Sequence, residues 1–144
     1  MAPKRRPQAV TLKRRVNWSD ADAAGIMNTA RAFDYAIEVI EEFYRRELGF
    51  SFGELISKHG MGIPMVHIEA DFMAPLAQGK MLTLSATLER LGRSTVSWRV
   101  EARRTDRKVA FRVRATSSFI RNDTFRSVAI PGAWRKKLSR YLPA

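Results

Sequence analysis

The chain has 144 residues, 45% of them hydrophobic, and a formal net charge of +12 at pH 7. This length fits one domain with a substantial core, and no apolar run approaches the roughly 20 residues that a membrane-spanning helix needs. The absence of cysteine excludes disulfides, catalysis by a thiolate and metal sites built on cysteine. No apolar signal-peptide segment follows the basic start of the chain, so we expect a cytoplasmic protein with no membrane partner.

The beginning of the chain predicts an arm followed by a strand. Residues 1–8 are rich in Pro, Lys and Arg and show no periodicity, which predicts a disordered basic arm before one domain over 9–144. Apolar residues then alternate from Val10 to Trp18, interrupted by Arg14, as in a half-buried strand. We expect Trp18 to lie in the core.

Two helices are predicted next. From about Thr29 the apolar residues recur at helical spacing for roughly five turns, with a broad apolar face. Asn28 or Thr29 can cap the start of this helix, and Gly49 can end it. Ser51, followed three residues later by a glutamate, forms a capping box for a second, short helix that Gly60 ends.

The rest of the chain returns to a period of two residues. A last strand is expected at an edge over 125–130, and Pro131 then opens a short basic helix. The order of elements predicts an α+β domain, an antiparallel sheet of five to six strands with the long helix on one face. Short polar connections join four alternating segments, which predict a meander of strands over 66–72, 82–89, 96–103 and 109–115.

The most distinctive segment is the run from Trp18 to Ile26, in which Asp20 and Asp22 precede a small-residue turn and the long helix. Backbone N–H groups at a helix start lack partners and carry partial positive charge. A carboxylate beside such donors suits hydrolysis, whereas the alternative is an aspartate that only caps the helix. We interpret Asp20 as structural, binding amides of the turn.

An amphipathic helix follows the pattern Trp18-x-Asp20-x-Asp22-x-Ala24-Gly25-Ile26, and weaker motifs come later, over 42–49, 62–66 and 72–75. This order of motifs resembles the 4-hydroxybenzoyl-CoA thioesterase family, whose members are hotdog-fold acyl-CoA thioesterases. The resemblance implies a hotdog fold, with the sheet wrapped around one long central helix. It also implies a hydrolase that releases a free acid and CoA and needs no metal or redox cofactor.

The resemblance assigns roles to residues of this loop. Asp22 stands at the position of the family's catalytic carboxylate, either as a nucleophile or as a general base. The N–H groups of Asn28, Thr29 and Ala30 are candidates for the oxyanion hole, and Gly25 supplies a backbone geometry that a side chain would hinder. Relatives commonly carry an aromatic residue at position 28 or 29, so we do not expect 4-hydroxybenzoyl-CoA to be the substrate.

Cations near hairpin ends are candidates for CoA binding. Related enzymes hold the CoA phosphates with basic residues in the segment that matches Arg90 and Arg93, and Lys80 is a third candidate. The alternative is a solvated basic surface. The spacing of His59 and His67 does not predict a metal site. Hotdog domains pair edge to edge and share active sites, so we expect a homodimer or homotetramer.

Two other functions stay open from the sequence. A hotdog enoyl-CoA hydratase would need a histidine near the helix start, but the first histidine is His59. A non-catalytic protein could instead bind acyl-CoA, or use its basic clusters on nucleic acid. No stacking aromatics interleave with those clusters, which argues against nucleic acid as the partner.

Overall fold

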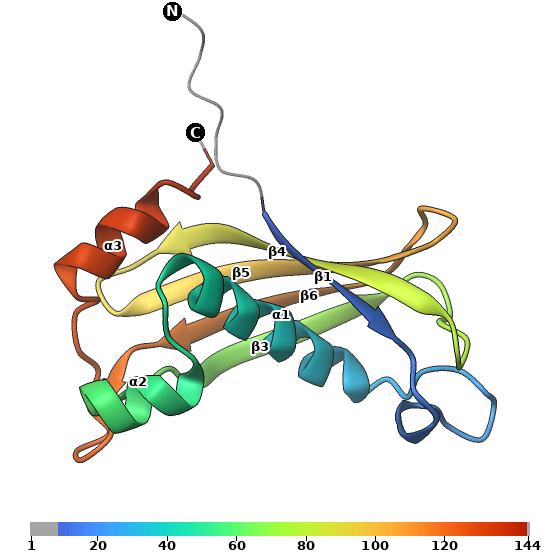
Figure 1. Cartoon of the computed structure of the whole chain (residues 1–144), viewed down its shortest axis with the longest axis horizontal. Coiled ribbons are helices and arrows are strands. Elements are labelled where there is room, and N and C mark those ends of the chain that lie inside the picture. Colours follow the sequence, from blue (N-terminus) through green and yellow to red (C-terminus); the bar gives the residue numbers. More distant parts are fainter. Residues whose placement is uncertain (1–8, 144) are drawn as a thin grey trace, which may run out of the picture.

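One long helix lies in the curl of a five-stranded antiparallel sheet (Figure 1). The structure, a computed structural model, describes residues 9–143, so the arm expected over 1–8 lies outside the described residues. The sheet order is β1-β4-β5-β6-β3, and β2 pairs separately with β7. In chain order the elements are β1 (Val10–Arg15), the 3-10 helix η1 (Trp18–Asp20), α1 (Arg31–Glu47), α2 (Phe52–His59), β2 (Met61–Gly62), β3 (Met65–Phe72), β4 (Met81–Leu91), β5 (Thr95–Arg104), β6 (Val109–Ser118), β7 (Ile120–Arg121) and α3 (Gly132–Ser139).

The core lies between α1 and the central strands of the sheet. Trp98 on β5 is fully buried, and its ring packs edge-on against Phe43 and Tyr44 of α1, with centroid distances of 4.7 and 5.6 Å. Such aromatic pairs add to the free energy gained by burying their area. The alternating residues of β4 and β5 supply the facing layer, as their sequence predicted. This confirms the α+β hotdog fold.

The helix ends predicted at Gly49, Ser51 and Gly60 are confirmed. The cap expected at Asn28 or Thr29 was wrong: the N-cap of α1 is Ala30, which makes no side-chain cap hydrogen bond. Gly49, just beyond α1, has φ +79 and allows the chain to turn away. Ser51 Oγ accepts from the N–H of Glu54 at 3.1 Å, and the Glu54 carboxylate accepts from the N–H of Ser51 at 3.3 Å. This is the expected capping box of α2, and Gly60 ends that helix with φ +62.

Three other predictions were wrong. The four alternating segments do not form one meander: β4, β5 and β6 pair in sequence, but β3 pairs with β6 and not with β4, because the chain crosses the sheet between β3 and β4. Trp18 is 83% exposed, because the chain leaves β1 after Arg15 and turns through η1, so the alternation no longer decides which side a residue faces. No strand covers 125–130; Ile120 begins the short strand β7 instead. Phe125 has φ +57 and is 77% exposed, as expected in a turn rather than in a strand.

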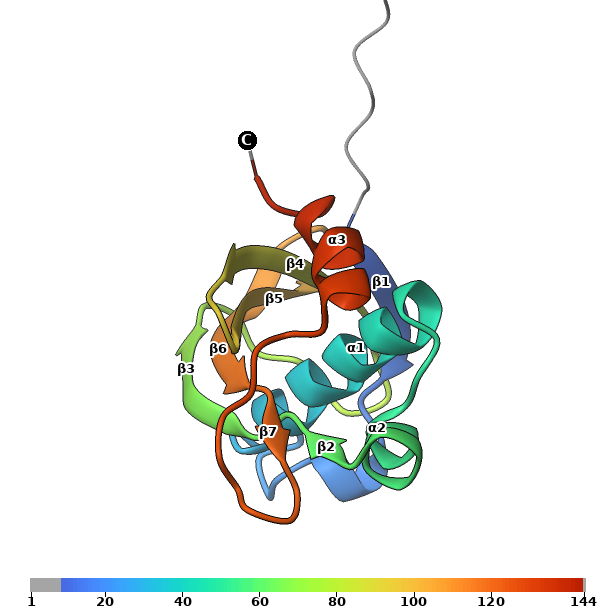
Figure 2. The same cartoon turned by 90° about the vertical axis from the view of Figure 1, so that its left-hand side faces the viewer.

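The molecule has two ends that differ in composition. At the helix-start end, α1 begins beside the β1–α1 loop and the start of β4. At the helix-finish end, which faces the viewer in Figure 2, lie α2, the β2–β7 pair and α3. The 11 residues of β4 run from one end to the other, about 36 Å at the usual rise of a strand. Across the described residues, no helix is long and apolar enough to cross a membrane.

Candidate functional site

The loop between β1 and α1 is a small antiparallel hairpin. Ala21 pairs with Met27, and the N–H of Asp22 donates to the carbonyl of Ile26 at 2.9 Å. Gly25 makes the turn with φ +78, where a residue with a side chain would be strained. The hairpin therefore presents Asp22 at the helix-start end.

The side chain of Asp22 is exposed, and among the described residues only one of its two carboxylate oxygens accepts a hydrogen bond. Its Oδ1 accepts from the N–H of Ala24 at 2.9 Å, which forms an Asx turn. Within residues 9–143, its Oδ2 has no hydrogen-bond partner. Asp22 lines an open cavity of about 520 Å³ together with Trp18 and Gln78. A carboxylate fixed through one oxygen and free at the other can act as a nucleophile or as a base.

The three candidate oxyanion donors differ in availability. The N–H of Asn28 donates to the carbonyl of Asp20 at 2.8 Å. The N–H of Ala30 donates to Oδ1 of Asn28 at 3.0 Å. The N–H of Thr29 has no acceptor in the part of the chain that the structure describes. Thr29 is therefore the one donor of this set that is free to meet a ligand.

Thr29 lines a second, mainly apolar cavity of about 300 Å³ together with Phe72, Met73 and Phe111. Ile26 lines this cavity and its neighbour Gly25 lines that of Asp22, so the hairpin contributes residues to both cavities. Ile26 and Thr29 are three positions apart, which is at most about 11 Å of chain. One chain thus brings the carboxylate and the free amide to the same loop but in different cavities.

Asp20 is buried and serves as an anchor of this loop. Its Oδ2 accepts from the Tyr35 hydroxyl at 2.8 Å, from Arg14 at 2.9 Å and from the N–H of Asn17 at 3.3 Å. Burial alone would raise the pKa of the Asp20 carboxyl, but the hydrogen bonds from Tyr35 and Arg14 lower it below its ordinary value. The ionised form of Asp20 is therefore favoured, and its burial and its three protein donors fit a structural role.

The three cations expected to hold CoA do not share one site in the chain. Lys80 directly precedes β4 at the helix-start end, where its carbonyl accepts from the N–H of Val16. Arg90 lies near the other end of β4, about 33 Å away along the strand. Arg93 follows in the β4–β5 connection, where its carbonyl accepts from Arg135 of α3 at 3.0 Å. Only Arg90 and Arg93 come together, at the helix-finish end.

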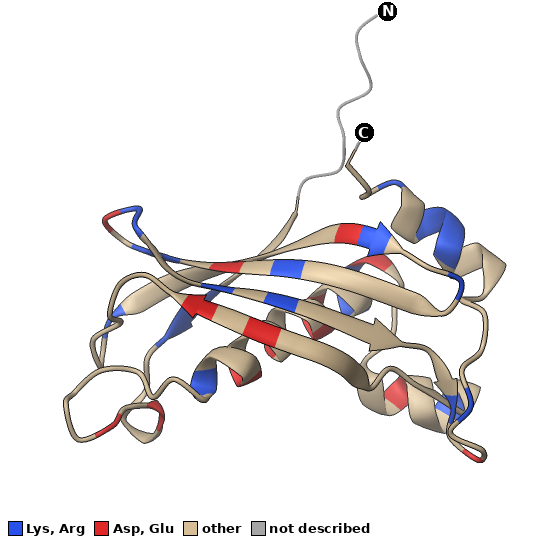
Figure 3. Ribbon diagram, turned by 180° about the vertical axis from the view of Figure 1, so that it is seen from behind, with Lys and Arg blue, Asp and Glu red and all other residues tan. Residues whose placement is uncertain are grey.

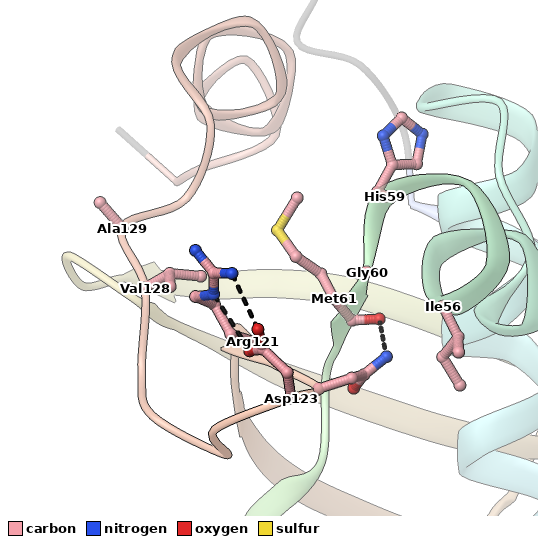
Figure 4. Close-up of a pocket in the computed structure, with 9 residues that line it drawn as sticks. Ile56, His59, Gly60, Met61, Arg121, Asp123, Val128 and Ala129 are labelled. Carbon is pink, nitrogen blue, oxygen red and sulfur yellow. Dashed lines mark hydrogen bonds and ion pairs between the residues drawn. The ribbon is translucent and has the colours of Figure 1, made fainter.

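Further cations gather at that end, and two of them, Arg121 and Arg126, were missed by sequence reasoning. Arg121 and Arg126 flank the turn after β7, and basic residues cover α3 nearby (Figure 3). Arg121 is paired with Asp123 at 2.9 Å and lines a cavity of about 520 Å³ that also contains His59 (Figure 4). The turn residues Asn-Asp-Thr at 122–124 could have indicated this hairpin in place of the expected strand.

Comparison with known proteins identifies the family. The sequence profile of the thioesterase-like superfamily matches residues 16–138. The chain belongs to the thioesterase-like superfamily. The family expected from the sequence is thereby confirmed at the level of this superfamily, and the β1–α1 loop lies inside the matched region.

Individual known proteins resemble the chain to different extents. It is 32% identical over 89 residues to a 1,4-dihydroxy-2-naphthoyl-CoA hydrolase from Synechococcus sp. (strain CC9605), a match that spans 58% of this chain and 59% of that relative. A thioesterase superfamily structure from Jannaschia sp. CCS1 is 27% identical, with a TM-score of 0.88 over 99% of both chains. Slr0204, a 1,4-dihydroxy-2-naphthoyl-CoA thioesterase from Synechocystis, shares the fold at 21% identity, with a TM-score of 0.83 over 91% of this chain and 96% of that one.

Proposed function

We propose that this member of the superfamily is an acyl-CoA thioesterase in which Asp22 and the Thr29 amide act on the same thioester. The observation that carries the proposal is the free Thr29 N–H, on the same loop as an exposed carboxylate that has one free oxygen. The superfamily match supports the reaction class. Hydrolysis adds water across the C–S bond and releases the acid and the CoA thiol.

The chemistry needs an oxyanion donor and a carboxylate on the reacting carbonyl. The Thr29 N–H would donate to the carbonyl oxygen as negative charge develops there, and one such donor typically contributes about 3 kcal/mol. Asp22 would then either attack the carbonyl carbon, giving a mixed anhydride that water cleaves, or take a proton from an attacking water. The apolar cavity of Phe72, Met73 and Phe111 beside Thr29 would receive the acyl group.

We further propose that the complete site forms in a homodimer. In one chain, Asp22 and the cations Arg90 and Arg93 lie at opposite ends of the sheet. β3 is an edge strand, and antiparallel pairing with the β3 of a second copy would reverse the direction of the sheet at the interface. The helix-finish end of one subunit would then meet the helix-start end of the other. The exposed side chains of Val66 on β3 and Phe72 at its end support burial there.

Thiol release by the full-length protein tests the reaction. The substrates are a panel of aryl, short-chain and long-chain acyl-CoAs, led by 1,4-dihydroxy-2-naphthoyl-CoA because two relatives carry that name. We expect Asp22→Asn to lower kcat at least about 100-fold, while Asp106→Asn, a change at an exposed hairpin carboxylate, leaves it unchanged. A folded Asp22→Asn protein with the wild-type rate would refute the assignment. Binding of acyl-CoA without turnover would indicate a non-catalytic protein, and consumption of an enoyl-CoA without free thiol would indicate a hydratase.

Mixed dimers test the shared site. Asp22→Asn and the double variant Arg90→Ala/Arg93→Ala are each expected to be weakly active alone. If each site takes Asp22 from one subunit and the arginines from the other, a mixed dimer contains one intact site. Random reassortment of equal amounts should then restore about a quarter of the wild-type rate, because half the dimers are mixed and each has one good site. No recovery after verified exchange would refute a site shared between Asp22 of one subunit and the arginines of the other.

A further inference from the structure

Arg14 occupies a position that the alternation of β1 assigns to the inner face of the sheet. Val10 and Val16 share its parity and are buried, and the side chain of Arg14 is only 20% exposed. Its guanidinium lies over the ring of Tyr35 on α1, 3.9 Å from the centroid. A cation in such a position is uncommon and needs partners, because a buried charge without them is costly.

Those partners come from two other elements. One arm of the guanidinium donates to Asp20 of η1 at 2.9 Å, and the other donates to Glu38 of α1 at 2.6 Å. The Tyr35 hydroxyl donates to the same Asp20 oxygen at 2.8 Å. Arg14 thus joins β1, the loop and the long helix through charged hydrogen bonds, which are the stronger kind.

The anchored residue holds the loop that carries the proposed catalytic groups. Asp20 precedes Asp22 by two residues, and its carbonyl accepts from the N–H of Asn28 at 2.8 Å. That bond occupies the amide next to Thr29 and fixes the base of the hairpin, where Ala21 pairs with Met27. A shift of Asp20 would therefore move the carboxylate of Asp22 relative to the Thr29 amide.

We propose that Arg14 is a positioning residue that acts through Asp20 to set the geometry between Asp22 and the Thr29 N–H. The inference rests on the proposed function. A buried ion pair is often no more stabilising than apolar residues of similar volume, so folding alone does not account for an arginine on the inner face of β1. Arg14 lines neither the cavity of Asp22 nor that of Thr29, so it acts through its neighbours and not on the substrate.

The test compares Arg14→Met with Lys13→Met. Lys13 is the exposed neighbour on the outer face of β1, and the two variants lose the same charge from the same strand. We expect Arg14→Met to lower kcat at least tenfold, with KM changed less than about twofold, because misplacing a reacting group slows the chemical step and spares substrate binding. Lys13→Met should retain both constants. A wild-type kcat for folded Arg14→Met would overturn the proposal.

A double variant separates this proposal from the proposed function. If Arg14 acts only by placing Asp22, then Arg14→Met should not lower the residual rate of Asp22→Asn further. An equal fall in both backgrounds would show a role independent of Asp22 and would refute the positioning role. A wild-type rate for Asp22→Asn would refute the proposed function instead.

Two milder variants decide the matter if Arg14→Met does not fold. Tyr35→Phe keeps the ring beneath the guanidinium and removes only the hydroxyl that donates to Asp20. Arg14→Lys keeps the charge but cannot span Asp20 and Glu38 with a planar fork. Both are expected to lower kcat by several-fold at unchanged KM, with Arg14→Lys partly retaining the function. Full activity in both would overturn the proposal.

Discussion

The hydroxyl of Tyr35 donates to Oδ2 of Asp20 across 2.8 Å, and this bond fastens the long helix to the loop that carries Asp22. Burial raises the pKa of Tyr35 to about 12, so the hydroxyl keeps its proton at any working pH. The donor that holds Asp20 is therefore constant over the range in which a thioesterase would be assayed.

Two substitutions at Thr29 separate the effect of its backbone N–H from that of its side chain. Thr29→Pro eliminates the N–H, and proline is tolerated near a helix start, whereas Thr29→Ala keeps the N–H and removes the hydroxyl. We expect a loss of about 100-fold in kcat for the proline variant and near-wild-type kcat for the alanine variant. Thermal unfolding of both proteins checks that the fold survives. Equal rates for the two variants would exclude this amide as the oxyanion donor.

Acid should weaken the fold partly through Asp20. Its pKa is lowered in the folded protein from the ordinary 3.8, so its ionised form contributes stability that is present above that value and is lost as the pH falls through the folded pKa. The carboxyl faces Arg14 of β1 and both Tyr35 and Arg31 of α1. We expect Asp20→Asn to be less stable than wild type at pH 7, with the difference narrowing below pH 3.8.

Denaturant unfolding at a series of pH values measures this difference. Asp34→Asn, which changes an exposed carboxylate on α1, is the matched control and should follow the wild-type curve. A gap between wild type and Asp20→Asn that stayed constant down to low pH would contradict the linkage.

The capping box of α2 should contribute measurable stability. Ser51→Ala removes the hydroxyl that accepts from the N–H of Glu54, and the loss of such a cap typically costs about 1 kcal/mol in the free energy of unfolding. Ser57→Ala, at an exposed position within the same helix, is the control and should change stability by less than about 0.5 kcal/mol. Equal effects of the two substitutions on the free energy of unfolding in urea would show that the cap contributes no stability.

Cations at the two ends of β4 should affect substrate binding differently. We expect Arg93→Ala to raise the KM for acyl-CoA about tenfold at low salt. The increase should be smaller at high salt, because dissolved ions screen contacts between cations and phosphates. KM for the same acyl group on pantetheine, which lacks the nucleotide, should not change. Lys80→Ala, at the other end of the strand, should not raise the KM for acyl-CoA in the same assay. A rise in KM for both substrates would mean that Arg93 acts on the fold or on the acyl group instead.

Local signals predicted most of the fold. The ends of α2 follow from Ser51 and Gly60, because capping depends on residues a few positions apart. The alternation of apolar and polar residues located β3 to β6, because this pattern also depends only on residues close together in the chain. Trp18 was wrongly predicted to lie in the core. Whether its side chain faces the core depends on where the chain leaves β1, and alternation does not mark that point.

The candidate site was less accessible to sequence reasoning. Asp22 was singled out from a local motif, but the availability of Thr29 depends on acceptors contributed by Asp20 and Asn28, which only the folded loop brings into place. Lys80 and Arg90 flank the strand predicted over 82–89, so the sequence already implies that they lie at opposite ends of β4. Grouping them in one CoA site overlooked this separation.

The free donor at position 29 belongs to the main chain, so its place does not depend on which side chain that residue carries. Substitutions at position 29 can change the shape of the cavity next to Phe72 and Met73. The amide itself keeps its position, because the neighbouring Asn28 N–H is bonded to the Asp20 carbonyl. Under the proposed function, acyl preference can therefore diverge during evolution, one neighbouring residue at a time, without a change in the proposed catalytic groups.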